Sequence, residues 1–382
     1  MMRPMMRPTP IGALDGLPPA FVDGRGAIGL PDDLRAHWHV RSEARGHDPR
    51  ADSTVRQTVD AAIVETTMRV AGGEARHRAY GTGAGRVVIE IDNDSSAAFA
   101  VAIVLSDADR LDEVGWTYQP ARSCTAADVD AVYHRLTVDD TEVGIGSRGG
   151  AIALVWPVSH RGSLRVTIGA ARADPASVAG AEEVRRAWRA HLRRGMRVEI
   201  DDRALGDAID QARVALLVES GRADAETTRA LEDWGFDAEA ASAWDRLGAP
   251  QRARLRRRRA DPATAWTRAR HHLERNEAAL FLNAMREVLA LDRRRSVDAV
   301  DLLPGFPPDW LGLGVGIHDA PARCGAHLSA ALRWHGDRPA LLWETSSPIT
   351  LRCPRFDSGF STRACAGEVL LPSRPRELLG LS

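Results

Sequence analysis

The chain has 382 residues, of which 44% are hydrophobic and 27% charged, the composition of a globular protein with two or three domains. Its formal net charge of −1 excludes bulk electrostatic attraction to nucleic acid or to a membrane surface. All 51 basic positions are arginine, which excludes P-loop, pyridoxal and protein-kinase chemistry, because each of these uses a lysine side chain.

The N-terminal part of the chain has the pattern of a β-protein. Residues 1–55 are rich in Pro, Gly, Arg and Asp, and we expect irregular coil there with one or two edge strands. From 61 to 170, short apolar runs alternate with turn signals, a spacing typical of antiparallel sandwiches. We therefore predict an N-terminal β-sandwich domain over 1–175.

A helical period follows. Val184, Trp188 and Leu192 predict a linker helix, and Asp201 and Asp202 are suited to cap a helix that reaches Glu219. We predict an α-helical hairpin domain over 176–300 and a C-terminal β-domain over 301–382, and hence a multidomain α+β protein. The remaining helices are expected at 224–233, 237–247, 250–258, 262–273 and 275–292.

Charge is divided unevenly within the helical segment. Residues 201–247 contain twelve acidic residues and five arginines, whereas residues 250–295 contain thirteen arginines and five acidic residues. We expect these two halves to pack beside each other with complementary charge. The arginine-rich run Gln251–Arg259 also suits phosphate contacts, but the aromatic residues that stack on single-stranded bases are sparse there.

Tryptophan and acidic residues are neighbours at several positions. Indole rings stack on the apolar faces of sugars and carboxylates bind their hydroxyl groups, so such neighbours suit a carbohydrate site. The alternative is that the tryptophans are core anchors and the acids are ordinary helix-end charges. The candidate carbohydrate-binding residues are Asp233, Trp234, Asp237, Trp244 and Asp245, with Glu232 beside them, and similar neighbours occur at Asp309-Trp310 and Trp343-Glu344.

Other motifs favour structural roles. The glycine-rich segments Gly81–Arg86 and Gly144–Gly150 are expected to be turns, since a phosphate loop needs a helix after it. His37 and His39 would share one face if their segment were a strand, and His271 and His272 are adjacent, but neither pair has a third metal ligand at a recognisable spacing. The four cysteines show no zinc-binding spacing, and Cys353 and Cys365 are expected to be reduced. We expect neither a metal nor a cofactor.

Several segments share features with one known architecture: the linker helix with Trp188, then Val198–Leu205, Ala230–Ala241, Pro307–Trp310, Ala331–Gly336 and Ala340–Glu344. Through these segments, residues 60–372 resemble the six-hairpin glycosidase-like superfamily. It implies a β-supersandwich, an (α/α) toroid with a sugar-binding groove, and a C-terminal β-domain. Fewer helices fit this segment than such a toroid contains, and no acid or base can be aligned, so the catalytic residues are unknown.

The sequence therefore predicts a carbohydrate-associated protein of glycoside-hydrolase-like ancestry with reduced or no hydrolytic activity. The alternative is a non-enzymatic interaction protein that docks a partner through its arginine-rich helical surface around Arg256–Arg259. An oligosaccharide ligand and a homo-oligomer are the expected partners, and nucleic acid is not expected. No apolar run is long enough to span a membrane, and we expect a cytoplasmic location.

Overall fold

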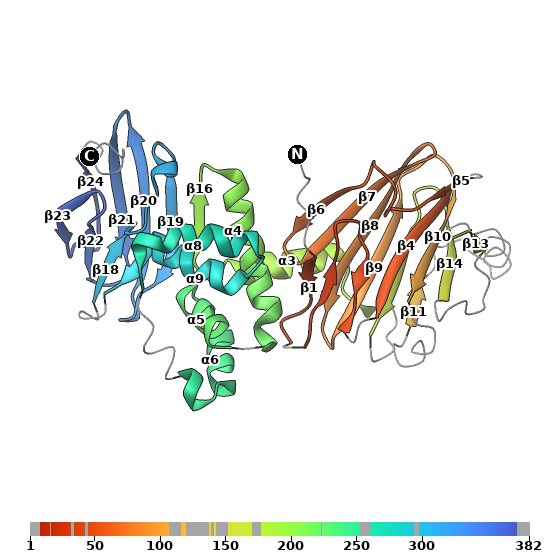
Figure 1. Cartoon of the computed structure of the whole chain (residues 1–382), viewed down its shortest axis with the longest axis horizontal. Coiled ribbons are helices and arrows are strands. Elements are labelled where there is room, and N and C mark those ends of the chain that lie inside the picture. The colour runs from red at the N-terminus through yellow and green to blue at the C-terminus, as the bar shows by residue number, and fades with distance from the viewer. Residues whose placement is uncertain are drawn as a thin grey trace. The chain divides into compact units, whose positions relative to one another are not determined.

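The structure is a computed structural model that mixes helices with antiparallel and mixed sheets (Figure 1). It describes residues 8–15, 17–31, 34–42, 45–106, 116–119, 137–138, 141–142, 152–169, 177–222, 224–252, 260–293 and 298–372. The chain divides into two compact units, Met1–Trp188 and Arg189–Ser382. The α+β class is therefore as predicted, whereas the predicted further boundary near residue 300 falls inside the second unit and stays a prediction.

The first unit contains two large antiparallel sheets. The seven-stranded sheet has the order β1-β2-β3-β4-β10-β14, with β5 paired to β4, and the six-stranded sheet has the order β11-β15-β9-β8-β7-β6. The first comprises β1 (Thr9–Ile11), β2 (Ala20–Val22), β3 (Ile28–Gly29), β4 (Arg35–Ser42), β5 (Arg45–His47), β10 (Phe99–Leu105) and β14 (Ile152–Val158). The second comprises β6 (Arg56–Asp60), β7 (Ile63–Val70), β8 (Gly73–Thr82), β9 (Arg86–Asn93), β11 (Trp116–Gln119) and β15 (Ser163–Ile168), and β12 (Thr137–Val138) pairs separately with β13 (Thr141–Glu142).

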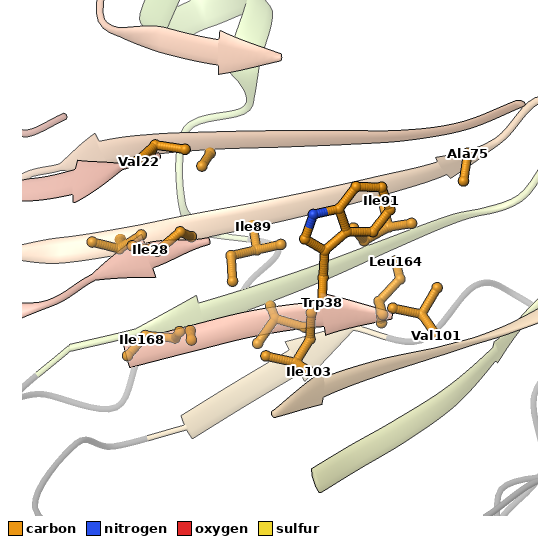
Figure 2. Close-up of a cluster of buried hydrophobic side chains, with 14 of the residues drawn as sticks. Val22, Ile28, Trp38, Ala75, Ile89, Ile91, Val101, Ile103, Leu164 and Ile168 are labelled. Atoms are coloured by element: carbon orange, nitrogen blue, oxygen red, sulfur yellow. The ribbon is translucent and has the colours of Figure 1, made fainter. Parts of the chain in front are cut away.

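Side chains of both sheets share one hydrophobic core. Trp38 lies among Ile89 and Ile91 of β9, Val101 and Ile103 of β10, and other buried residues (Figure 2). Because successive side chains on a strand point to opposite faces, each strand contributes every second residue to this core. The two sheets thus form a sandwich.

The expectation of irregular coil with one or two edge strands over residues 1–55 is wrong. The described part of this segment contains five strands, and β4 lies inside the sheet between β3 and β10. Ala36, Trp38 and Val40 are all buried, and they alternate with His37 and His39. This period of two is itself a strand signal, but the histidines and the surrounding turn residues obscured it.

The second unit begins with helices and ends with strands. Helix α3 (Ala181–Leu192) crosses the boundary between the units in the sequence. It is followed by β16 (Arg197–Ile200), α4 (Arg203–Val218), η3 (Glu219–Arg222), α5 (Ala225–Asp233), α6 (Asp237–Arg246), α8 (Pro262–Glu274) and α9 (Ala278–Leu289). Asp202 caps α4 as predicted, because its side chain accepts a hydrogen bond from the Leu205 amide.

Helix α9 is the central element of the helical part. Every residue from Phe281 to Leu289 is buried, and α9 packs against α4, α5 and α8. The expected helix over 275–292 is shorter than predicted, because residues 290–292 leave the helix as a strand that pairs with Ala299–Leu302. The pairing satisfies backbone groups that a longer helix would satisfy internally.

Two sheets complete the second unit. The five-stranded sheet has the order β16-β19-β20-β21-β24, and the four-stranded sheet the order β17-β18-β22-β23, in which β18 and β22 are parallel. Their strands are β17 (Ala290–Asp292), β18 (Ala299–Leu302), β19 (Val315–Pro321), β20 (His327–His335), β21 (Arg338–Thr345), β22 (Thr350–Cys353), β23 (Asp357–Thr362) and β24 (Ala366–Leu370), with the short helix η4 (Pro308–Trp310) before β19.

Candidate functional site

The predicted carbohydrate-binding residues lie on the α5–α6 hairpin (Figure 1). Helix α5 ends at Asp233 with Trp234 as its C-cap residue, and Gly235 takes a left-handed conformation, with φ of 75°, that turns the chain into α6. Glycine adopts this conformation without a Cβ clash, which explains the short connection. The hairpin therefore places the end of α5 beside α6.

Trp234 is a core residue and not a ligand-binding one. Its side chain is 0% exposed, and its indole N–H donates to the Leu282 carbonyl of α9 at 3.0 Å. Phe236 is 2% exposed, and the amide of Met196 donates to the Trp234 carbonyl. A fully buried indole with a satisfied N–H offers no surface to a sugar, so the core interpretation holds for this residue.

Trp244 and Glu232 form the polar centre of the candidate site. Trp244 is half-buried, and its indole N–H donates to Glu232 Oε1. The Trp244 carbonyl accepts a hydrogen bond from Arg252, which fixes this end of α6. The indole therefore keeps part of its surface open while a carboxylate holds its edge.

The pKa of Glu232 is raised above its ordinary value. Partial burial of the carboxyl group is the main cause, the hydrogen bond from Trp244 acts in the opposite direction, and the nearby charge of Asp233 raises the pKa further. More weakly, Arg323 lowers this pKa and Asp237 raises it. Both acidic and basic side chains therefore lie near Glu232, and their charges act on its pKa in opposite directions.

The remaining acidic candidates are placed less favourably. Asp233 is paired with Arg229 at 3.0 Å, a helical i, i+4 pair that occupies its carboxylate. Asp237 and Asp245 are exposed, and Asp237 lies in the first turn of α6, where a negative charge stabilises the helix. The structure therefore brings Glu232, Asp233, Asp237 and Trp244 to one hairpin and gives Asp245 no role in the Trp244–Glu232 contact.

Arg286 ties this hairpin to the C-terminal strands. Its side chain is 3% exposed and donates to the carbonyls of Asp233, Ala290 and Pro321. Asp292 lies 3.5 Å from Arg286 and accepts a hydrogen bond from the Arg323 amide. A buried guanidinium with this many acceptors holds the backbone around Glu232 in one arrangement.

A buried carboxylate that the sequence did not single out lies deeper in the helical part. Glu287 of α9 is 1% exposed, and its carboxylate accepts hydrogen bonds from Arg229 at 3.1 Å, from Arg268 at 2.6 Å and from the Asp261 amide at 3.0 Å. Burial acts to lower the pKa of Arg229, but the charges of Asp233 and Glu287 raise it overall. Because its acceptor positions are occupied and it is out of reach of solvent, Glu287 fits a structural role.

The contact between Arg229 and Glu287 differs from the charge complementarity that the sequence predicts. The acidic and basic halves do pack together, since α5 and α9 are in contact. Among the described residues, however, the ion pair that joins the two halves links an arginine of the acidic half, Arg229, to a glutamate of the basic half, Glu287. The arginines of 253–259, on which the interaction-protein alternative depends, lie outside the described residues.

A serine, a histidine and an aspartate meet in the first unit. Ser42 Oγ is 2.9 Å from His47 Nε2, and His47 Nδ1 is 3.9 Å from Asp52 Oδ2. These are the residue types of a hydrolase triad. Ser42, however, is 2% exposed, and its hydroxyl also accepts a hydrogen bond from the Ala71 amide. The group links β4, β5 and the β7–β8 turn, and the buried hydroxyl is inaccessible to a substrate.

Two other sequence motifs prove structural. Gly81–Arg86 forms the end of the β8–β9 hairpin, in which Thr82 pairs with Arg86, so the turn prediction is confirmed. His37 and His39 lie on one face of β4, opposite Val104 and Ala102 of β10. The segment Gly144–Gly150 lies outside the described residues.

Within the described residues, no cluster of His, Cys, Asp and Glu is arranged to hold a metal ion. Cys353 is buried and has its thiol pKa raised to about 12 by that burial, and Cys324, Cys353 and Cys365 are free. Among the described helices, none combines the length and the apolar character that a membrane crossing requires. No protein-family model matches the chain, and no curated protein matches it either.

Proposed function

We propose that this chain is a carbohydrate-binding protein of glycosidase-like ancestry that does not hydrolyse glycosidic bonds. The observation that carries the proposal is the half-buried indole of Trp244, whose N–H is held by the Glu232 carboxylate on the α5–α6 hairpin. An indole fixed at its edge offers its ring to the apolar face of a sugar at little cost in conformational entropy. Glu232 then supplies an acceptor for the sugar hydroxyls.

The charges around Trp244 support binding more than catalysis. Hydrolysis by the usual routes needs two carboxylates about 5–9.5 Å apart on opposite sides of the scissile bond. On this hairpin, Asp233 is paired with Arg229, and Asp237 supports the first turn of its own helix. The buried carboxylate of Glu287 is closed off by two arginines. A raised pKa at Glu232 suits a general acid, but Asp233, the carboxylate next to it in the chain, is held by Arg229.

The packing of α9 supports the same interpretation. Helix α9 is buried from Phe281 to Leu289, so its side chains form a core and do not line a groove. The helical part is thus stable as a short bundle around one central helix. The C-terminal β-domain and the superfamily membership remain part of this proposal, with the helical part as a shortened form of the (α/α) toroid that binds sugar at the α5–α6 hairpin.

The test is calorimetric titration of the purified full chain with a panel of soluble maltohexaose, cellohexaose, chitohexaose and laminarihexaose. We expect heat release with at least one of these glycans, and a weaker signal in both Trp244→Ala and Glu232→Gln. Asp207→Asn is the matched control, because it neutralises an exposed carboxylate that belongs to α4 and not to this hairpin. Incubation with the same glycans should release no reducing ends.

Three results would overturn the proposal. If none of the glycans gives a binding signal, the chain is not a carbohydrate-binding protein of this kind. If reducing ends accumulate in the wild-type protein and not in Glu232→Gln, the chain is a hydrolase. Equal binding by wild type and Trp244→Ala would place any carbohydrate site elsewhere.

A further inference from the structure

Trp266 presents a second arrangement of an indole with a carboxylate. It lies on α8, is half-buried, and directs its indole N–H toward Asp309 Oδ2 at 3.5 Å. The sequence pairs Asp309 with its neighbour Trp310, but Trp310 is 2% exposed and belongs to the core. In the folded chain, Asp309 therefore lies beside the half-buried indole of Trp266, although its sequence neighbour is the buried indole of Trp310.

The Trp266 ring is held from beneath by an aromatic cluster. Its centroid is 5.0 Å from that of Trp310 in an edge-to-face arrangement, and Trp310 packs in turn on Phe306 at 5.8 Å. Phe306 continues the contact to Phe356 at 4.9 Å. Edge-to-face contacts of this kind orient a ring, so the open part of Trp266 is fixed before any ligand arrives.

Two charged side chains flank this ring without tight pairing. Arg270 is one helical turn after Trp266 on α8 and therefore lies on the same face of the helix. Arg270 Nη1 is 3.9 Å from Asp309 Oδ2, a long contact, and the two side chains are 61% and 66% exposed. Weak contacts at exposed positions contribute little to folding, which leaves both groups able to bind a ligand.

We infer that Trp266, Asp309 and Arg270 form a saccharide-binding subsite separate from Trp244. The apolar face of one pyranose ring would stack on Trp266, Asp309 would accept hydrogen bonds from two adjacent hydroxyls, and Arg270 would donate to hydroxyl or ring oxygens. The inference rests on the proposed function, because the ligand class is the same. It adds a second subsite, built by α8 and η4 and not by the α5–α6 hairpin.

The chemistry favours a neutral sugar over other ring-shaped ligands. Asp309 would repel a phosphate or carboxylate group, and Arg270 would repel a cation. A ligand of either charge is therefore disfavoured by one of the two side chains. A neutral ring with hydroxyl groups on its edge satisfies both at once. A neutral sugar also needs no closed cavity, because it can stack on one open face of an indole ring.

The experiment is titration of the full chain, labelled with ¹⁵N at its indole nitrogens, with the same four hexasaccharides. The Nε1 resonance of Trp266, assigned with Trp266→Phe, should shift on binding. We expect Asp309→Asn and Arg270→Gln to weaken binding at this resonance about tenfold, the equivalent of about 1.4 kcal/mol. Both substitutions are at exposed positions, so the fold should be unchanged by circular dichroism. Trp244→Ala should leave the Trp266 shift intact.

The outcomes separate the two proposals. A shift at Trp244 with no shift at Trp266 overturns the second subsite and leaves the proposed function standing. A shift at Trp266 that Asp309→Asn and Arg270→Gln leave unchanged also overturns it, because the flanking charges would then have no part in binding. The absence of shifts at both indoles overturns both proposals.

Discussion

His77 allows a quantitative prediction about the core of the first unit. Its side chain is 1% exposed and stacks on Trp38, with ring centroids 5.0 Å apart and planes inclined by 20°. Its Nδ1 has no hydrogen-bond partner among the described residues. Because burial disfavours the charged ring, the pKa of His77 is lowered to about 3 from an ordinary value of 6.5.

The sign and size of the effect follow from proton binding. Below pH 6.5 the unfolded chain takes up a proton at His77 that the folded chain does not, so the stability contributed by the neutral ring falls as pH decreases. One proton corresponds to about 1.4 kcal/mol for each pH unit, so the loss between pH 7 and pH 5 is about 2 kcal/mol. The loss continues until pH reaches the folded-state pKa of about 3.

The assay is urea-induced unfolding at pH 7, 6 and 5 for the wild type and for His77→Phe. Phenylalanine keeps a ring against Trp38 and removes the titrating group, and subtracting the two curves cancels every group they share. We expect the variant to lose about 2 kcal/mol less than the wild type between pH 7 and pH 5. Parallel pH dependence in the two proteins would show that His77 is protonated in the folded state, and the reasoning would be refuted.

Further substitutions test the packing of each unit. Glu287→Ala should destabilise the second unit by about 3–5 kcal/mol in thermal unfolding, because it leaves Arg229 and Arg268 without their shared buried carboxylate, and a loss below about 1 kcal/mol would contradict this. Gly81→Ala should destabilise the first unit, since its Cβ would lie 2.3 Å from the Gly12 Cα, whereas Gly83→Ala meets no atom within 4 Å and should be neutral; equal melting temperatures would contradict the pair. Asp202→Ala should cost about 1 kcal/mol of unfolding free energy through loss of the α4 cap, unless another group replaces that hydrogen bond.

The regular elements were largely predictable because their signals are local. Asp202 and Asp224 cap helices whose apolar period is visible in the sequence, and Pro262 begins α8 where a first turn tolerates proline. Strand β4 was missed, although Ala36, Trp38 and Val40 alternate as a strand should. Its polar positions carry histidine and arginine, and the flanking Pro and Gly residues made the segment look like coil.

The roles of the tryptophans depended on tertiary contacts. Trp234 and Trp244 are both adjacent to acids in the sequence, yet Trp234 is in the core and Trp244 is half-buried against Glu232. Asp309 is a second example, because the indole that it contacts is that of Trp266 and not that of its sequence neighbour Trp310. Sequence adjacency on a helix places two side chains on different faces, so it says little about which of them meet.

By itself, the sequence determined the α+β class, most helix positions, the absence of lysine chemistry and the tryptophan-rich composition. These follow from side-chain type and from periods of two and 3.6 residues, which are local properties of the chain. Only the tertiary structure decided that α9 is enclosed on all sides, that Glu287 is locked between Arg229 and Arg268, and which indoles remain open. Burial and ion pairing between distant segments depend on how the elements pack, and no local pattern specifies that packing.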